Sequence, residues 1–193
     1  SGDKPKRDQG QSLLQVAIKS GHLDIADLLI DRGADLNFIE EPTELNPFCQ
    51  PVIQTAGGRA VFDCRRMIKR WKGQYEMHSS KEKADQSFKV FEKMLELGAD
   101  ISQKNSHGGT LLQTILIETK EVLPSYSWKT KETRDNVLIT EELRHDLNRI
   151  YNLLIRYGVT SDEISAYYKS PLKELYQDSP TMEFLNRLDQ SRS

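Results

Sequence analysis

Residues 10–37 read GQSLLQVAIKSGHLDIADLLIDRGADLN, and this stretch carries the strongest structural pattern in the chain. Gly10 supplies a turn, and the hydroxyl of Ser12 stands where it can cap the free N–H groups of a following helix. Apolar residues then recur at helical spacing at Leu13, Leu14, Ala17 and Ile18, and again at Ile25, Leu28, Leu29 and Ile30. Gly21 ends the first helix, and Gly33 stands where a left-handed residue closes the second. The stretch predicts two short antiparallel helices that need neighbours to bury their apolar sides.

Parts of this stretch recur further along the chain. The segment LLQVA at 13–17 returns as VIQTA at 52–56 and as LLQTI at 111–115. The Gly-Ala-Asp exit at 33–35 returns at 98–100 and, in altered form, as Gly-Val-Thr at 158–160. A fourth beginning, SPLKEL, stands at 170–175, and the polar tail at 179–188 suits a last helix that faces solvent. The sequence therefore predicts a row of stacked helix pairs.

This pattern resembles the ankyrin repeat, in which a turn, two antiparallel helices and a Gly-Ala-Asp exit follow one another at fixed offsets. The resemblance implies an all-α solenoid that forms a single domain over residues 1–193. Its repeats are expected at about 7–39, 40–104 and 105–162, with a capping repeat at about 163–193. The family normally places a histidine that ties adjacent loops at the position of Gln15, Gln54 and Gln113. An amide can still donate and accept there.

The second and third repeats are longer than the first. The joint between their two helices exceeds the ordinary joint by roughly 26 residues, which predicts insertions at 57–86 and 118–141. Either the insertions pack together into an accessory lobe, or each one lengthens its own helices. In a lobe, Trp71 and Trp128 are expected in the core and Tyr126 at the surface. The expected contacts join Val61, Phe62, Ile68 and Trp71 to Val122, Leu123, Tyr126 and Trp128.

Composition excludes several classes of function. The chain has 193 residues, 37% of them hydrophobic and 29% charged, and a net charge of -2, which argues against a dominant electrostatic partner. No apolar run is long enough to cross a bilayer. We expect a soluble, cytoplasmic and monomeric piece of a longer protein. Cys49 and Cys64 lack zinc-ligand spacing, and no base is paired with a nucleophile, so we predict no metal, no cofactor and no enzyme.

The resemblance also implies where a partner binds. Members of the family grip partners with the hairpin tips and the exposed side of the first helices. The register places the first tip at Phe38, Ile39, Glu40 and Glu41, and the second at Lys104, Asn105 and His107. The apolar pair Phe38-Ile39 is either a contact site or packs on the segment 42–51 that follows.

The two insertions offer further candidates. Basic residues and apolar residues recur at three and four over 59–72, which predicts a basic amphipathic helix. Its candidate binding residues are Arg65, Arg66, Lys69, Arg70 and Trp71. Such a helix either docks on an acidic protein, a nucleic acid or a membrane surface, or forms a solvated face over an apolar stripe. In the second insertion, Tyr126 and Trp128 are residue types that anchor interfaces, although burial under the loop is the alternative.

The leading function is therefore a protein–protein interaction module, an adaptor or targeting scaffold within a larger protein. One alternative is binding of nucleic acid or another acidic surface through the basic helix at 59–72. Another is the non-catalytic part of an enzyme whose active site lies elsewhere in the parent chain. Degenerate repeats with long insertions further suggest a bacterial effector that acts in the host cytosol and binds a host protein.

Overall fold

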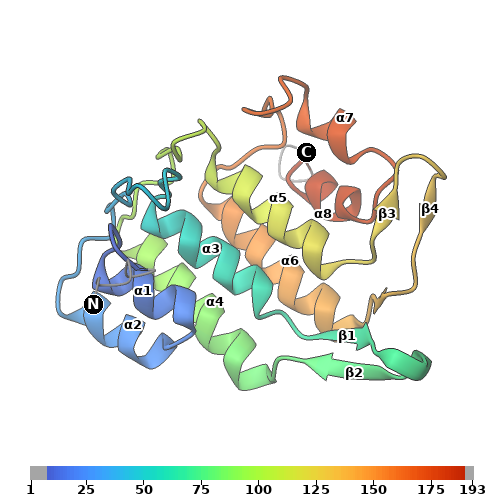
Figure 1. Cartoon of the computed structure of the whole chain (residues 1–193), viewed down its shortest axis with the longest axis horizontal. Helices are drawn as coiled ribbons and strands as arrows, with labels where there is room; N and C mark the ends of the chain where they lie inside the picture. Colours follow the sequence, from blue (N-terminus) through green and yellow to red (C-terminus); the bar gives the residue numbers. More distant parts are fainter. Residues whose placement is uncertain (1–7, 190–193) are drawn as a thin grey trace.

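A computed structural model describes residues 8–189 and is mostly helical. Its α-helices are α1 (Leu13–Ser20), α2 (Leu23–Asp31), α3 (Val52–Phe62), α4 (Lys81–Glu96), α5 (Leu111–Val122), α6 (Glu141–Arg156), α7 (Leu172–Tyr176) and α8 (Thr181–Arg187). They form two layers (Figure 1). In one layer α1 packs on α3 and α3 on α5, and in the other α2 packs on α4 and α4 on α6. The short helices α7 and α8 follow, with α8 against α5 and α6.

Local sequence explains where these helices begin and end. Four of them start at a Ser or Thr whose hydroxyl accepts a hydrogen bond from the backbone N–H three residues later: Ser12, Ser80, Thr110 and Thr140. At Gly33 the backbone turns left-handed, with a φ of 79°, so the chain leaves α2 as predicted. The expected apolar stripes are only partly buried, because Leu13, Ile25 and Leu28 are exposed.

The core lies between the two layers, and its tightest contact joins α3 to α5. A Cβ on Gly57 would lie 3.0 Å from the Cδ1 of Leu111 and 3.1 Å from the Cδ1 of Ile115. The missing side chain at Gly57 therefore lets the two helices approach closely. The doublet Gly57-Gly58 serves helix packing within this core.

Three glutamines connect neighbouring loops, as expected from their place in the pattern. Gln15 Nε2 donates to the carbonyl oxygen of Gln50, at 3.1 Å. Gln54 Nε2 donates to the carbonyl oxygens of Gln103 and Gly109, at 3.0 and 2.9 Å. Gln113 repeats the arrangement on a later loop, donating to the Ile164 carbonyl oxygen at 3.1 Å. Each amide therefore holds the loop that follows its own helix pair.

Two small sheets make the fold other than all-α. Their strands are β1 (Arg66–Lys69), β2 (Tyr75–His78), β3 (Tyr126–Ser127), β4 (Glu132–Thr133) and β5 (Val137–Leu138). The first sheet has the antiparallel order β2-β1-β5, and the second pairs β3 with β4. Ile68 lies opposite Val137, so the segments 57–86 and 118–141 contact each other. Each of the two alternatives describes part of the structure, because the segments contact each other through β1 and β5 and the helices α3, α4, α5 and α6 are also longer than α1 and α2.

The expected core of this contact is wrong. Trp71 lies in the short 3-10 helix η1 (Trp71–Gly73) at the end of the β1–β2 hairpin and is 91% exposed. Trp128 is also exposed, whereas Val122 and Leu123 are fully buried. The contact is made by strand pairing because β1 and β5 present complementary backbone edges. No helix within residues 8–189 is long and apolar enough to span a membrane.

Candidate functional site

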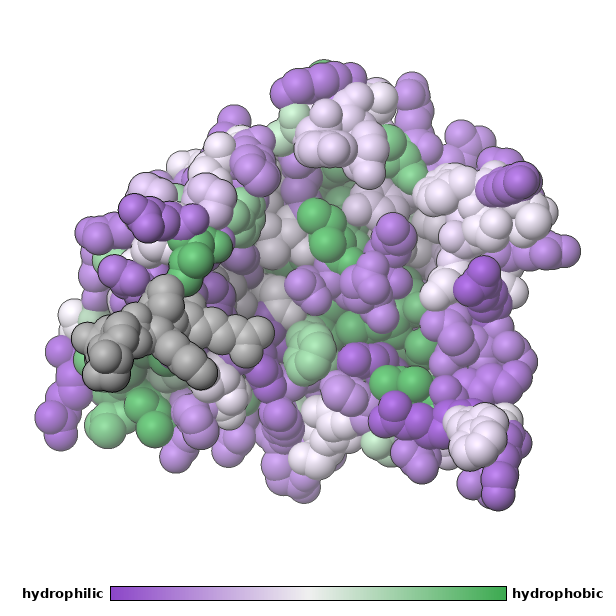
Figure 2. Space-filling view, viewed as in Figure 1, coloured by the Kyte–Doolittle hydropathy of each residue, from purple (hydrophilic) through white to green (hydrophobic). Residues whose placement is uncertain are grey.

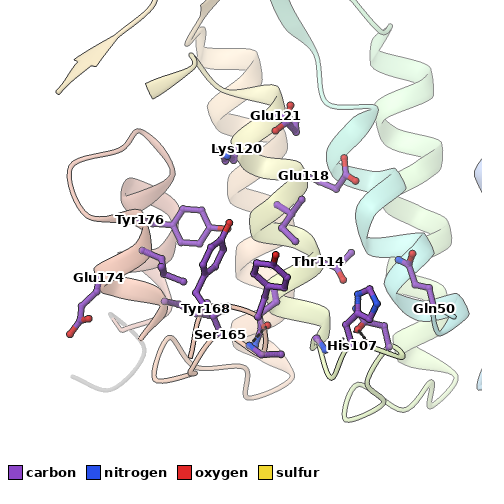
Figure 3. Close-up of a pocket in the computed structure, with 18 of the residues that line it drawn as sticks. Gln50, His107, Thr114, Glu118, Lys120, Glu121, Ser165, Tyr168, Glu174 and Tyr176 are labelled. Atoms are coloured by element: carbon purple, nitrogen blue, oxygen red, sulfur yellow. Dashed lines mark hydrogen bonds between the residues drawn. The ribbon is translucent and has the colours of Figure 1, made fainter. Parts of the chain in front are cut away.

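A groove of about 850 Å³ lies over α5. One side is the hairpin tip at 105–109, and the other is formed by residues 165–168 and α7. Phe48 and Trp128 contribute from further away in the sequence, and Figure 3 shows His107 and Tyr168 on the two sides of the groove. Figure 2 shows that this face is hollowed, with apolar surface on the floor and hydrophilic surface around it.

Aromatic and apolar side chains give the groove its exposed contact surface. Tyr167 and Tyr168 are 79% and 65% exposed, and their rings meet edge to face with centroids 4.9 Å apart. Phe48 and His107 form a second ring pair at 5.1 Å. Ile117 of α5 is exposed between them. Solvent-exposed tyrosine, tryptophan and phenylalanine side chains are residue types that anchor protein interfaces.

Two polar side chains of α5 at the floor of the groove are already hydrogen-bonded. Gln113 Oε1 accepts from the backbone N–H of Ala166, at 3.0 Å. Thr114 Oγ1 donates to Gln54 Oε1, at 3.0 Å. The first bond ties α5 to the 165–168 loop and the second ties it to Gln54 of α3, so the aromatic residues stand on a rigid support.

Three carboxylates at the groove, in contrast, have no hydrogen-bond partner or counterion among the described residues. The side chains of Glu118, Glu121 and Glu174 make no hydrogen bond or ion pair to any residue within 8–189. Burial raises the pKa of Glu118, and the nearby Glu121 raises it further, while Arg66 opposes both. Burial also raises the pKa of Tyr176 to about 12, so this phenol stays neutral.

The first predicted tip is largely structural. Ile39 pairs with Pro51, and the backbone N–H of Val52 donates to the Phe38 carbonyl oxygen at 2.9 Å. The pair Phe38-Ile39 therefore packs on the segment that follows, which was one of its two alternatives. Glu40 is only 3% exposed and accepts a hydrogen bond from Lys19 Nζ at 3.1 Å. An exposed role for Glu40 is wrong, because this ion pair draws the carboxylate inward, while Glu41 remains exposed.

Residues of the second predicted tip have two different roles: one shapes the tip, and two line the groove. Asn105 Oδ1 accepts from the backbone N–H groups of His107 and Gly109, at 3.0 and 2.9 Å, so it shapes the tip. Both Asn105 and His107 line the groove, and His107 is exposed. Lys104 is exposed but is not among the lining residues.

The predicted basic helix at 59–72 is wrong after Phe62. Arg65 binds Asp146 of α6 through Nε and Nη2, at 2.9 and 2.8 Å, and the chain then continues as strand β1. Arg66 is 7% exposed, and its Nη1 donates to the Phe62 carbonyl oxygen at 2.7 Å.

Two further cations of this segment, Lys69 and Arg70, are also paired. Lys69 binds Asp135, and Arg70 Nε donates to Glu76 at 3.0 Å. A continuous basic face is absent here because these cations point in different directions or form ion pairs within the described residues. Of the five candidate residues, Trp71 alone has a side chain that is almost fully exposed to solvent.

Trp128 was expected in the core and Tyr126 at the surface, but the structure shows the reverse order of exposure. Their rings meet edge to face at 4.9 Å, with Tyr126 half-buried and Trp128 exposed. Trp128, rather than Tyr126, lines the groove.

Sequence reasoning did not identify Tyr167, Tyr168, Ile117 and Glu118. The doublet Tyr167-Tyr168 precedes the Ser170-Pro171 beginning, where a hairpin tip is expected, and it was the available clue. Chemistry at the cysteines finds no support, because Cys64 is fully buried and burial raises the pKa of its thiol. Within residues 8–189, no cluster of three or more His, Cys, Asp or Glu side chains is arranged to hold a metal.

Comparison with known families agrees with the helical pattern at the start of the chain. Residues 9–38 match the family model of the ankyrin repeat. The matched residues contain α1, α2 and the left-handed exit at Gly33. No curated protein matches the chain. Residues 9–38 of this chain therefore resemble an ankyrin repeat in both sequence and structure.

Proposed function

We propose that this chain is the adaptor or targeting module of a larger protein and that it binds a protein partner in the groove over α5. Ankyrin repeats are generally protein–protein interaction modules. The observation that carries the proposal is the cluster of exposed aromatic residues, Tyr167, Tyr168 and Trp128, around a hollow with a hydrogen-bonded floor. Interfaces concentrate their binding energy in such rigidly held aromatic residues.

The same proposal retains the division of the chain into four repeats. The family match covers the first, and the later repeats are supported by the recurrence of helix pairs and by the loop ties of Gln54 and Gln113. The segments 57–86 and 118–141 are proposed as insertions into the second and third repeats. The proposal further describes the module as monomeric, cytoplasmic and non-catalytic. It acts as an effector on a host protein. Composition and the divergence of the repeats support these parts of the proposal.

A capture experiment with matched variants tests the groove. The double variant Ile117→Ala/Tyr168→Ala removes two exposed groove side chains, and Trp71→Ala/Met77→Ala removes two exposed side chains from the β1–β2 hairpin. We expect the groove variant to lose the partner recovered from lysate by the wild type and the hairpin variant to keep it. Loss of a central hot-spot pair lowers affinity by about 10- to 100-fold.

Thermal unfolding of both variants is the control for native folding. The opposite pattern, in which the hairpin variant loses the partner and the groove variant keeps it, contradicts the proposal. It would assign the interaction to the β1–β2 hairpin instead.

A further inference from the structure

The groove face of α5 separates charge from apolar surface. Glu118 and Glu121 are three residues apart on one side of the helix, and Lys120 lies on the other side (Figure 3). Ile117 is exposed beside Glu118, and Tyr168 stands across the groove. The face therefore presents two carboxylates next to an apolar and aromatic surface.

Arg66, the cation that acts on Glu118, forms no ion pair with it among the described residues. Arg66 acts on Glu118 electrostatically, yet its guanidinium is held by the carbonyl oxygens of Phe62 and Cys64, at 2.7 and 3.4 Å. The side chain of Glu118 is half-buried and lies 3.4 Å from the position that a Cβ on Gly58 would take. A partly desolvated carboxylate without a counterion is unfavourable, so a cation from outside the chain gains from binding beside it.

We propose that the partner presents an extended segment in which a lysine or arginine binds between Glu118 and Glu121 and a neighbouring apolar side chain packs on Ile117 and Tyr168. This inference rests on the proposed function and specifies the chemistry of the partner. Charge complementarity carries it, because the groove offers three unpaired carboxylates, at Glu118, Glu121 and Glu174, against the single ammonium of Lys120. The exposed tyrosine ring further favours a cation at close range.

Selection from a phage-displayed library of random peptides tests this chemistry directly. We expect the wild-type chain to enrich peptides that contain Lys or Arg next to an aromatic or aliphatic residue. For a synthetic peptide of the enriched sequence, fluorescence anisotropy should give an affinity that falls at least about tenfold in Glu118→Gln/Glu121→Gln. The matched control Glu44→Gln/Glu96→Gln removes two exposed carboxylates away from the groove and should change affinity less than about twofold.

The variant Ile117→Ala/Tyr168→Ala separates this inference from the proposed function. Enriched peptides without basic residues whose binding is lost in this variant overturn the inference and leave the groove as the binding site. Basic peptides whose binding is unchanged in Glu118→Gln/Glu121→Gln also overturn it. Peptide binding that survives both groove variants overturns the proposed function as well.

Discussion

Asp146→Ala is expected to destabilise the protein by about 3–5 kcal/mol, because it leaves Arg65 without its partner in a largely buried position. Asp146 is fully buried on α6. Its carboxylate accepts three hydrogen bonds from Arg65, from the backbone N–H at 3.0 Å, from Nε at 2.9 Å and from Nη2 at 2.8 Å. This contact fixes the chain where it leaves α3 and enters β1. The measurement is the free energy of unfolding in urea at pH 7.

Asp135→Ala is the matched control, because the Lys69–Asp135 pair is exposed to solvent and screened. We expect its unfolding midpoint to equal that of the wild type. Equal midpoints for Asp146→Ala and the wild type would contradict the role of the Arg65–Asp146 pair.

The same pair gives the stability a dependence on pH. Burial alone would raise the pKa of Asp146, but the hydrogen bonds from Arg65 and His145, together with the charge of Arg149, outweigh it and hold this pKa below its ordinary value. A carboxyl whose pKa is lower in the folded than in the unfolded state stabilises the fold above the unfolded pKa. That contribution is lost as the pH falls through the folded pKa. Asp85, whose pKa is lowered to about 2 by Lys81 and Arg149, acts in the same direction. In Asp146→Asn the loss of stability between about pH 4 and pH 2 should be smaller than in the wild type.

Gln54→Ala is expected to cost about 2–4 kcal/mol, the largest effect among the three loop-tying glutamines. Gln54 is fully buried, and both ends of its amide are used. Its Nε2 donates to two carbonyl oxygens of the next tip, and its Oε1 accepts from Asn105 Nδ2 and Thr114 Oγ1, at 3.3 and 3.0 Å. Removal of the amide leaves buried partners on the tip and on α5 unsatisfied.

Gln15 gives an internal comparison for this prediction. Gln15 is also fully buried, but its Oε1 has no hydrogen-bond partner within the described residues, so Gln15→Ala should cost less. Gln86→Ala, on the exposed side of α4, is the surface control and should be neutral or slightly stabilising, because alanine favours the helix. Chemical denaturation of Gln54→Ala, Gln15→Ala and Gln86→Ala measures the free energy of unfolding of each variant and so checks this order. A smaller loss for Gln54→Ala than for Gln15→Ala would contradict it.

Local pattern was sufficient for the helices and for the loop ties. Ser12 caps the helix that its position predicts, and Gln15, Gln54 and Gln113 bind the loops that the family histidine would bind. These features depend on residues within one helix pair and the loop that follows it. Their geometry follows from spacing alone.

Long-range contacts explain what the sequence did not predict. Over 65–72 the basic and apolar residues recur with a helical period, yet Arg65 is held by Asp146 and β1 pairs with β5, both about 70 to 80 positions away. The groove likewise brings Phe48, Trp128 and Tyr168 together from three separate segments. No local period encodes such a juxtaposition, because it depends on how the later helices pack against one another.

Site-specific photocrosslinking tests most directly whether the groove over α5 binds the partner. Benzoylphenylalanine is introduced by Ile117→benzoylphenylalanine in the groove and, separately, by Trp71→benzoylphenylalanine at the exposed hairpin, and each protein is irradiated in the lysate that yields the partner. We predict a covalent adduct with the partner from position 117 and none from position 71. An adduct from position 71 together with none from position 117 would contradict the account.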